Sequence, residues 1–366
     1  MATELELAQL ITLNRITGVG GQTIRALIAE FGSCDEIFNA KKHHFSKING
    51  IGNKLAENIS SQLNLDRGKK ELEFIQSKKI NATSWYDSDF PKQLKACPDS
   101  PLLLFSKGIT NWDSQRIVSI VGTRKATPYG FDCISQLIAE MAAKENYTVV
   151  SGLAYGIDSI AHQACLKHNV PTWGVLAHGL DQIYPTKHRE LAKEMLKQGA
   201  LITEFTSGTA MVPNNFLSRN RIIAGLSSCT IVVESAEKGG SLVTAEIANS
   251  YNRDVFAFPG RVNDKYSIGC NLLIRNNKAH LIQELSNLEY IMNWQSSNKI
   301  PAQRQLFVEL TADEELLHKY LSNEPIFIDT LCQETQLSMS KTLSLLFSLE
   351  MKGVVRSLAG KMYALI

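Results

Sequence analysis

Two arginines with one residue between them, Arg219 and Arg221, stand before a short apolar run, and a glycine turn follows that run. The run, IVV at 231–233, is typical of a strand covered on both faces, and the turn, KGGS at 238–241, opens a helix-like stretch. Glycine lets a ligand approach the backbone, and the first N–H groups of a helix lack partners within it. With the fork-shaped arginine donors, this order predicts a phosphate site. The competing interpretations are structural: the arginines only cap a helix on a solvated face, or a buried arginine pairs with Glu204 or Glu234.

The same association of strand, glycine turn and helix recurs earlier in the chain. RIVSIV ends in GTRK at 122–125, YTVV ends in SGLAYG at 151–156, and GVLA ends in HGL at 178–180. Because ligands of parallel sheets bind beyond the carboxyl ends of the strands, these turns are expected to lie together, with Arg124 supplying charge. Each glycine taken singly is equally consistent with a tight turn that holds no ligand.

Cations are spread over several of these loops, among them Arg124, Lys187 and Arg189, which indicates a chain of phosphates rather than one phosphate. Phe216 and Tyr184 offer faces on which bases could stack, and such stacking is worth about 1 to 3 kcal/mol per base. Core packing is the alternative role for both rings. A nucleic-acid strand is therefore the ligand that the sequence favours.

Known fingerprints of catalysis and of cofactors are absent from the sequence. It contains no GxxxxGK[ST] motif, and its only GxG turns lie in the N-terminal helical region, so neither a P-loop nor a nicotinamide site is expected. His162, His178 and His188 lack metal-ligand spacing, and no GxSxG motif occurs. The seven cysteines form no CxxC pair and are consistent with small buried residues in a reducing compartment. We expect no cofactor and no metal.

Composition limits the kind of nucleic-acid binding. With 38 Lys and Arg against 36 Asp and Glu, the net charge is +2, which excludes a uniformly basic surface and requires a local patch. The N-terminus carries acids and lacks the pattern of a signal peptide, and no apolar run approaches the ~18 residues of a membrane span. The sequence predicts a cytoplasmic protein without a membrane segment.

The 366 residues divide into about two or three domains. Two similar glycine turns, at 16–28 and 48–59, resemble helix-hairpin-helix turns of a small SAM-like helical domain, although a plain helical bundle is also consistent with them. Alternating apolar runs and helix-like segments predict an α/β domain with a Rossmann-like parallel sheet. The predicted order is a helical domain at 1–65, a connector at 66–108 with one strand at 102–105, the Rossmann-like domain at 109–292, a linker at 293–305 and a winged-helix-like domain at 306–366.

Several motifs in this order resemble the DNA-processing protein A (DprA/Smf) family: YDSDFPKQL, IVGTRKATPYG, VVSGLAYGIDSIAHQACL, GLDQIYP, SRNRIIAGLS, GGSLVTAEIA, VFAFPG and SIGCNLLI. The resemblance covers about 200 residues. It implies a protein of natural transformation that binds incoming single-stranded DNA without sequence preference, forms a homodimer through its Rossmann-like domain and loads a RecA-type recombinase. It also implies that the protein is not an enzyme.

Carried over by motif, the family's DNA pocket gives an expected set of contact residues, to which the residues of the glycine turn are added. They are Gly122, Thr123, Arg124, Ser151, Gly152, Ala154, Gly156, Lys187, Asn215, Phe216, Arg219, Asn220, Arg221, Gly240 and Ser241. The chain departs from the family where Asn214 and Asn215 replace a basic residue that members often place before FxxRNR. The winged helix carries few cations on its third helix, so a protein contact is as consistent with it as duplex reading.

Two other classes of protein remain as alternatives. Gly239, Gly240, Thr244 and Glu246 resemble the PGGxGTxxE motif of LOG-type nucleotide phosphoribohydrolases, but the proline and third glycine are missing and the threonine is displaced by one position. A winged-helix transcription regulator is the third class, and it would prefer one duplex sequence to a single strand.

Overall fold

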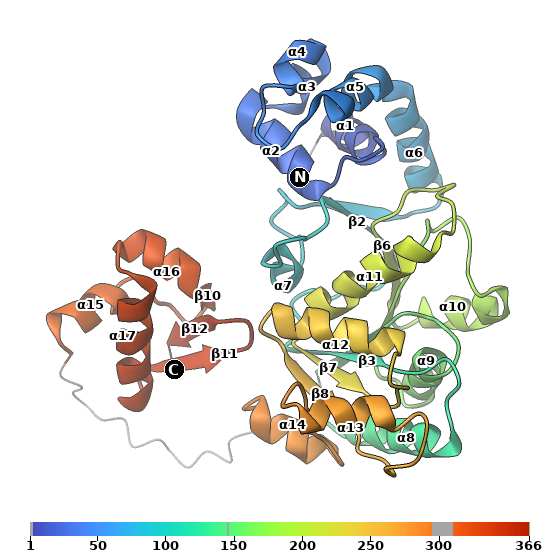
Figure 1. Cartoon of the computed structure of the whole chain (residues 1–366), viewed down its shortest axis with the longest axis vertical. Coiled ribbons are helices and arrows are strands. Elements are labelled where there is room, and N and C mark those ends of the chain that lie inside the picture. The colour runs from blue at the N-terminus through green and yellow to red at the C-terminus, as the bar shows by residue number, and fades with distance from the viewer. Residues whose placement is uncertain (1–2, 145, 295–309, 366) are drawn as a thin grey trace.

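The computed structural model describes residues 3–144, 146–294 and 310–365. Helices at the N-terminus, an α/β domain in the middle and a small C-terminal domain follow one another along the chain, as the blue, green-to-orange and red parts of Figure 1 show. The architecture confirms the predicted fold class, a Rossmann-like sheet domain between a helical domain and a winged helix.

Six helices form the N-terminal part: α1 Glu4–Asn14, α2 Gly21–Phe31, α3 Cys34–Asn39, α4 Lys42–Phe45, α5 Asn53–Gln62 and α6 Leu65–Ser77. Apolar residues at helical spacing, such as Ile11, Ile24 and Ile59, are fully buried between them. Helix α6 packs closely on α1 because a Cβ at Gly68 would lie only 2.0 Å from the Ala8 oxygen. The helical unit thus extends past residue 65, into the segment that was expected to be a connector.

The two glycine turns of this part have different surroundings. At the first turn, Arg25 Nη1 donates to the Ser100 carbonyl at 3.1 Å, and a Cβ on Gly21 would meet the same oxygen at 3.1 Å. At the second, a Cβ on Gly50 or Gly52 would meet no described atom within 4 Å. The first turn therefore packs against the segment around Ser100, whereas the second glycine turn is open, with space around Gly50 and Gly52.

A nine-stranded sheet organises the middle domain, in the order β1-β2-β6-β5-β4-β3-β7-β8-β9. The strands from β6 to β9 across this order run parallel, while β1 and β2 add antiparallel edge pairs. Their bounds are β1 Asn81–Ser84, β2 Leu103–Gly108, β3 Arg116–Val121, β4 Tyr147–Ser151, β5 Thr172–Val175, β6 Ala200–Thr203, β7 Cys229–Val232, β8 Asp254–Ala257 and β9 His280–Leu281.

The chain reverses its direction of travel across the sheet between β3 and β7. From β3 it continues to β4, β5 and β6 on one side, and from β7 to β8 and β9 on the other. In open α/β sheets, ligands bind at such a switch point, beyond the carboxyl ends of the two central strands.

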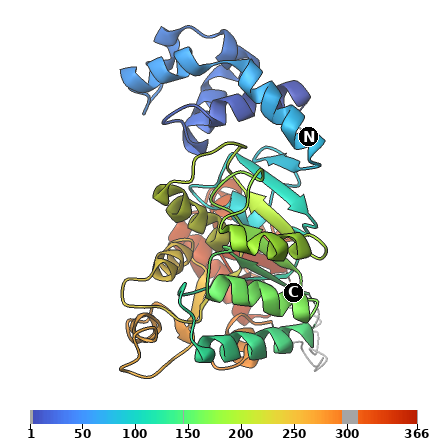
Figure 2. The ribbon, with the colours of Figure 1, turned by 90° about the vertical axis from the view of Figure 1, so that its right-hand side faces the viewer.

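Helices cover both faces of the sheet (Figures 1 and 2). One apolar core joins the sheet to α7 Lys92–Lys95, α11 Pro213–Leu226, α12 Gly240–Ser250 and α13 Ile268–Arg275. The opposite face packs against α8 Pro128–Ala142, α9 Ile157–Lys167, α10 Arg189–Met195 and α14 Leu285–Ile291, with a short 3₁₀ helix, η1, at Thr186–His188. Both faces are buried, which explains the unbroken apolar runs of the central strands.

The segment 66–108 does not form a separate connector. It contains most of α6, then β1, α7 and β2, so it contributes a helix to the N-terminal unit and two strands to the large sheet. The strand expected at 102–105 corresponds to β2. Within the described residues, no helix is long and apolar enough to cross a membrane.

The C-terminal domain confirms three helices and a hairpin. Its elements are α15 Ala312–His318, β10 Ile326–Phe327, α16 Ile328–Thr335, α17 Met339–Met351, β11 Val355–Leu358 and β12 Met362–Leu365. They enclose a small core that includes Leu317, Leu331 and Leu346. The expected linker at 293–305 lies almost wholly outside the described residues.

Candidate nucleic-acid interface

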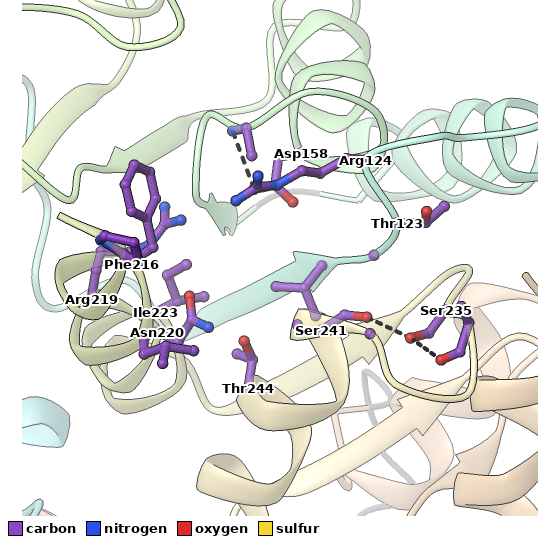
Figure 3. Close-up of a pocket in the computed structure, with 18 of the residues that line it drawn as sticks. Thr123, Arg124, Asp158, Phe216, Arg219, Asn220, Ile223, Ser235, Ser241 and Thr244 are labelled. Atoms are coloured by element: carbon purple, nitrogen blue, oxygen red, sulfur yellow. Dashed lines mark hydrogen bonds between the residues drawn. The ribbon is translucent and has the colours of Figure 1, made fainter. Parts of the chain in front are cut away.

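A cavity of about 760 Å³ opens at the switch point of the sheet (Figure 3). Its walls come from the loops after β3 and β7, from the start of α9, from one face of α11 and from the first turns of α12. The lining residues are Val121, Gly122, Thr123, Arg124, Ala154, Asp158, Tyr184, Met211, Pro213, Phe216, Leu217, Arg219, Asn220, Ile223, Ser235, Ala236, Gly239, Gly240, Ser241 and Thr244.

The start of α12 gives the cavity a wall of backbone donors. Gly239 occupies the N-cap position without a side-chain cap, and a Cβ on Gly240 would meet no described atom within 4 Å. Ser241 Oγ is turned to the neighbouring loop, where it donates to Ser235 Oγ at 2.9 Å. The first N–H groups of this 11-residue helix, at Gly240 and Ser241, therefore remain accessible to an anion.

Arg124 and two aromatic rings form the opposite rim. The exposed guanidinium of Arg124 has its carbon 5.9 Å from the centre of the Phe216 ring. Phe216 in turn meets Tyr184 edge-on, with the ring centres 5.8 Å apart. A cation beside partly exposed rings suits a phosphate with an attached base, because the charge attracts the phosphate and the rings stack on the base.

Two glycines bring the loops after β3 and β4 into contact. Gly156 has φ of 76°, and a Cβ there would lie 2.3 Å from the Thr123 oxygen. A Cβ on Gly122 would lie 2.5 Å from Ile157 Cγ1. Only glycine permits this approach, which places Thr123 and Arg124 at the mouth of the cavity.

Arg219 lies at the back of the cavity and donates hydrogen bonds to backbone carbonyl groups of the protein. It is 5% exposed, and its Nη1 donates to the carbonyl oxygens of Gly152 and Val175, both at 2.6 Å. Buried Asp158 is a nearby countercharge; its own pKa is raised by burial, while the Arg219 charge opposes that shift. Burial lowers the pKa of Arg219 to about 10. These bonds fix α11 against the ends of β4 and β5.

Arg221, two positions on, is paired on another side of α11. Its Nη2 contacts a carboxylate oxygen of Glu204, and each side chain is 16% exposed. Burial raises the pKa of Glu204, and the charge of Arg221 opposes that shift. Arg221 is not among the residues that line the cavity.

The structure brings together more than half of the residues predicted as contacts and places the others behind or beside the cavity. Those in its wall are Gly122, Thr123, Arg124, Ala154, Phe216, Arg219, Asn220, Gly240 and Ser241. Those outside it are Ser151, Gly152, Gly156, Lys187, Asn215 and Arg221. Ser151 donates to the Ile120 carbonyl at 2.6 Å, Asn215 donates to the Ala210 carbonyl at 3.0 Å, and Lys187 is exposed in η1.

Several lining residues were not foreseen. Ser235 and Ala236 follow β7 as Gly122 follows β3, so the rule that ligands bind at strand ends could have found them. Asp158 lies just after the SGLAYG turn. The apolar residues Met211, Leu217 and Ile223 carry no signal in the sequence that distinguishes them from core residues.

Each of the three histidines near the strand ends has a ring nitrogen within hydrogen-bond distance of another protein group. His162 Nδ1 lies 2.7 Å from Thr172 Oγ1, and His188 Nδ1 lies 2.9 Å from the Leu153 oxygen. His178 Nε2 accepts from the Tyr184 N–H at 3.2 Å. In the part of the chain that the structure describes, no group of three or more His, Cys, Asp or Glu could hold a metal ion.

Burial of His162 predicts a pH-dependent stability. The side chain is 0% exposed, and desolvation lowers its pKa to about 3, so the unfolded chain binds a proton more readily than the folded one. The contribution of neutral His162 to the free energy of unfolding is fully present above pH ~6.5, the pKa in the unfolded chain. It is lost as the pH falls toward the folded pKa, by about 1.4 kcal/mol per pH unit. Urea unfolding at several pH values should show a steeper fall between pH 6.5 and 5 for the wild type than for His162→Gln. The matched surface variant His44→Gln should keep the wild-type slope; equal slopes for all three proteins would contradict the prediction.

Comparisons with known proteins agree with this architecture. A family model described as DNA recombination-mediator protein A matches residues 81–293, a DprA winged helix domain matches 301–361, and a SAM-like helix-hairpin-helix tandem matches 10–65. Protein Smf of Synechocystis sp. is 31% identical over 98% of this chain and 98% of its own length. The DNA processing protein DprA of Bacillus subtilis is 41% identical over 54% of this chain and 66% of its own length.

Two solved structures are similar to the chain. DNA processing protein A from Streptococcus pneumoniae has a TM-score of 0.67 and 30% identity, and the match covers 79% of this chain and 98% of that one. DNA processing protein A from Helicobacter pylori, whose structure is described as showing a single-stranded DNA binding mode, has a TM-score of 0.53 and 29% identity over 59% of this chain and 96% of that one. The family model covers more than half of the sequence, and the chain belongs to the DNA recombination-mediator protein A (DprA/Smf) family.

Proposed function

We propose that this protein binds single-stranded DNA in the switch-point cavity without sequence preference, protects incoming DNA and loads a RecA-type recombinase on it during natural transformation. The observation that carries the proposal is one cavity that combines the uncapped start of α12, the Arg124 guanidinium and the Phe216 ring. The relative from Helicobacter pylori, with its described single-stranded DNA binding mode, supports the choice of ligand.

Family membership supports the remaining parts of the proposal. The protein acts in the cytoplasm as a homodimer, needs no cofactor and is a binding protein rather than an enzyme. Recombinase loading follows from its place as a mediator, because a mediator must hold the strand while the recombinase takes it over.

The winged helix offers little for a phosphate backbone on its third helix. Lys341 Nζ lies 2.8 Å from Asp313 Oδ2, and Lys352 Nζ lies 2.6 Å from Glu314 Oε2. The exposed positions Leu343 and Phe347 of α17 are apolar. This surface favours a contact with protein and weighs against a transcription regulator that reads duplex DNA.

The enzymatic alternative requires Glu246 beside the ligand. Glu246 instead pairs on the outer surface with Lys278, at 3.4 Å, where its side chain is 61% exposed, and it does not line the cavity. This position weighs against phosphoribohydrolase chemistry. Incubation with nucleoside monophosphates should release no free base; release that Glu246→Gln abolishes would contradict the binding function.

Binding of a fluorescent dT oligomer, titrated at several salt concentrations, tests the site. We expect the logarithm of affinity to fall linearly with the logarithm of salt concentration, with a slope of about −0.7 per phosphate contacted. Arg124→Ala should weaken binding and make the slope shallower by about 0.7, because one phosphate contact is lost. Arg356→Ala removes an exposed arginine of the winged helix and should change neither quantity. If Arg356→Ala has the effect and Arg124→Ala does not, the cavity is not the binding site.

A further inference from the structure

We propose that Asn220 is the residue with which the cavity selects unpaired bases of any identity. The inference rests on the proposed binding of single-stranded DNA and names how that site tells a single strand from a duplex. It assigns different roles to the three residues of the RNR motif: the two arginines hold the helix, and the asparagine between them contacts the base.

The helix geometry places Asn220 beside the ring on which a base would stack. Phe216, Asn220 and Ile223 follow one another at helical spacings of four and three, so they share one face of α11, and all three line the cavity. Figure 3 shows the Asn220 amide pointing from α11 into the cavity. A base stacked on Phe216 would bring its edge toward this amide.

The flanking arginines prevent α11 from turning this face away. Arg219 is bound to two carbonyls at the ends of β4 and β5, and Arg221 is paired with Glu204. The side chain of Asn220, half-buried between them, takes part in no hydrogen bond among the described residues. Its position is therefore fixed by its neighbours, while its amide is left uncommitted.

An uncommitted amide can bind every base. The Watson–Crick edge of each base carries a hydrogen-bond donor next to an acceptor: N3–H and O4 in thymine, N4–H and N3 in cytosine, N6–H and N1 in adenine, N1–H and O6 in guanine. The asparagine amide has the same pair of groups and meets either order by rotating through half a turn. In a duplex this edge is occupied by the partner base, so the contact is available only in a single strand.

A change from amide to carboxylate should convert this tolerance into a preference. Asn220→Asp leaves only acceptors, and guanine alone offers two adjacent donors, N1–H and N2–H. We expect the wild type to bind dT oligomers with and without three interspersed central guanines almost equally, and Asn220→Asp to shift the affinity ratio toward the guanine strand by about tenfold. Asn214→Asp adds the same charge at an exposed position of the same helix and should leave the ratio unchanged.

Asn220→Leu supplies the complementary test. It keeps the size of the side chain and removes the amide, so affinity for the dT oligomer should fall about tenfold. Abasic sites at the central nucleotides remove both the stacking on Phe216 and the contact with the amide, so they should cost the wild type about tenfold more than they cost Asn220→Leu, which has only the stacking to lose. Thermal unfolding midpoints within the error of the wild type would establish that these variants are folded.

The outcomes separate this inference from the proposed function. If Asn220→Asp weakens all strands equally, as a charge alone would, or if abasic sites cost the wild type and Asn220→Leu the same factor, base reading by Asn220 is wrong. A loss of affinity in Arg124→Ala would then still support strand binding in the cavity. If Arg124→Ala also leaves affinity unchanged, strand binding in the cavity fails as well.

Discussion

Replacing Arg219 with alanine should lower the free energy of unfolding of the Rossmann-like domain by about 3 to 5 kcal/mol. The guanidinium is buried, and its removal leaves the carbonyls of Gly152 and Val175 without these bonds and Asp158 without its nearby positive charge. Unpaired buried polar groups retain the full cost of their desolvation. The loss of DNA binding in this variant would then follow from a loss of the fold.

Urea unfolding followed by tryptophan fluorescence measures this change. Trp173 is fully buried on β5, the strand whose last residue, Val175, accepts a hydrogen bond from Arg219. Arg189→Ala, which removes an exposed arginine from the surface, should cost no more than about 0.5 kcal/mol. A stable Arg219→Ala variant that no longer binds DNA would show instead that Arg219 contacts the strand.

Replacing Arg221 with alanine should also destabilise the domain, by about 3 kcal/mol, because Glu204 would remain buried without its charge partner. The second change Glu204→Gln removes the stranded carboxylate, so the double variant should recover a large part of the lost stability. This recovery distinguishes an internal ion pair from a DNA contact.

Equilibrium unfolding of the four proteins of this cycle gives the coupling energy between Arg221 and Glu204. We expect the folded double variant to bind the dT oligomer with wild-type affinity, because neither side chain lines the cavity. Weak binding by a stable double variant would contradict the structural role of Arg221. Independent effects of the two changes would contradict the ion pair.

Local sequence patterns predicted most helices and strands, but they did not predict which of these elements lie side by side. The apolar runs identified the central strands from β3 to β8, because both faces of a parallel sheet are buried. Strands β1 and β9 carry no such run: β1 reads NATS, and β9 has two residues. Helix α6 went unrecognised because its sequence is rich in charged residues and contains Gly68, which allows close packing on α1.

The sequence predicted the site residues that lie in turns after strands. It did not predict the contacts that depend on the order of the strands in the sheet. Gly122, Arg124 and Gly240 were expected from the turns that follow strands, and they meet in one cavity. The RNR arginines were expected to contact DNA, with pairing of a buried arginine to Glu204 or Glu234 as the structural alternative. In the structure they bond to Gly152, Val175 and Glu204. The sequence alone did not decide between Glu204 and a DNA contact, because the choice depends on which strands lie side by side.

A crystal structure with a short oligothymidine would show whether the strand binds in the switch-point cavity. We expect a phosphate at the N–H groups of Gly240 and Ser241 and near Arg124, with a base stacked on Phe216 and its edge against the Asn220 amide. Arg219 and Arg221 should keep their bonds to protein groups in the complex. A strand bound along the open second glycine turn or along the winged helix, with the cavity empty, would contradict the proposed site.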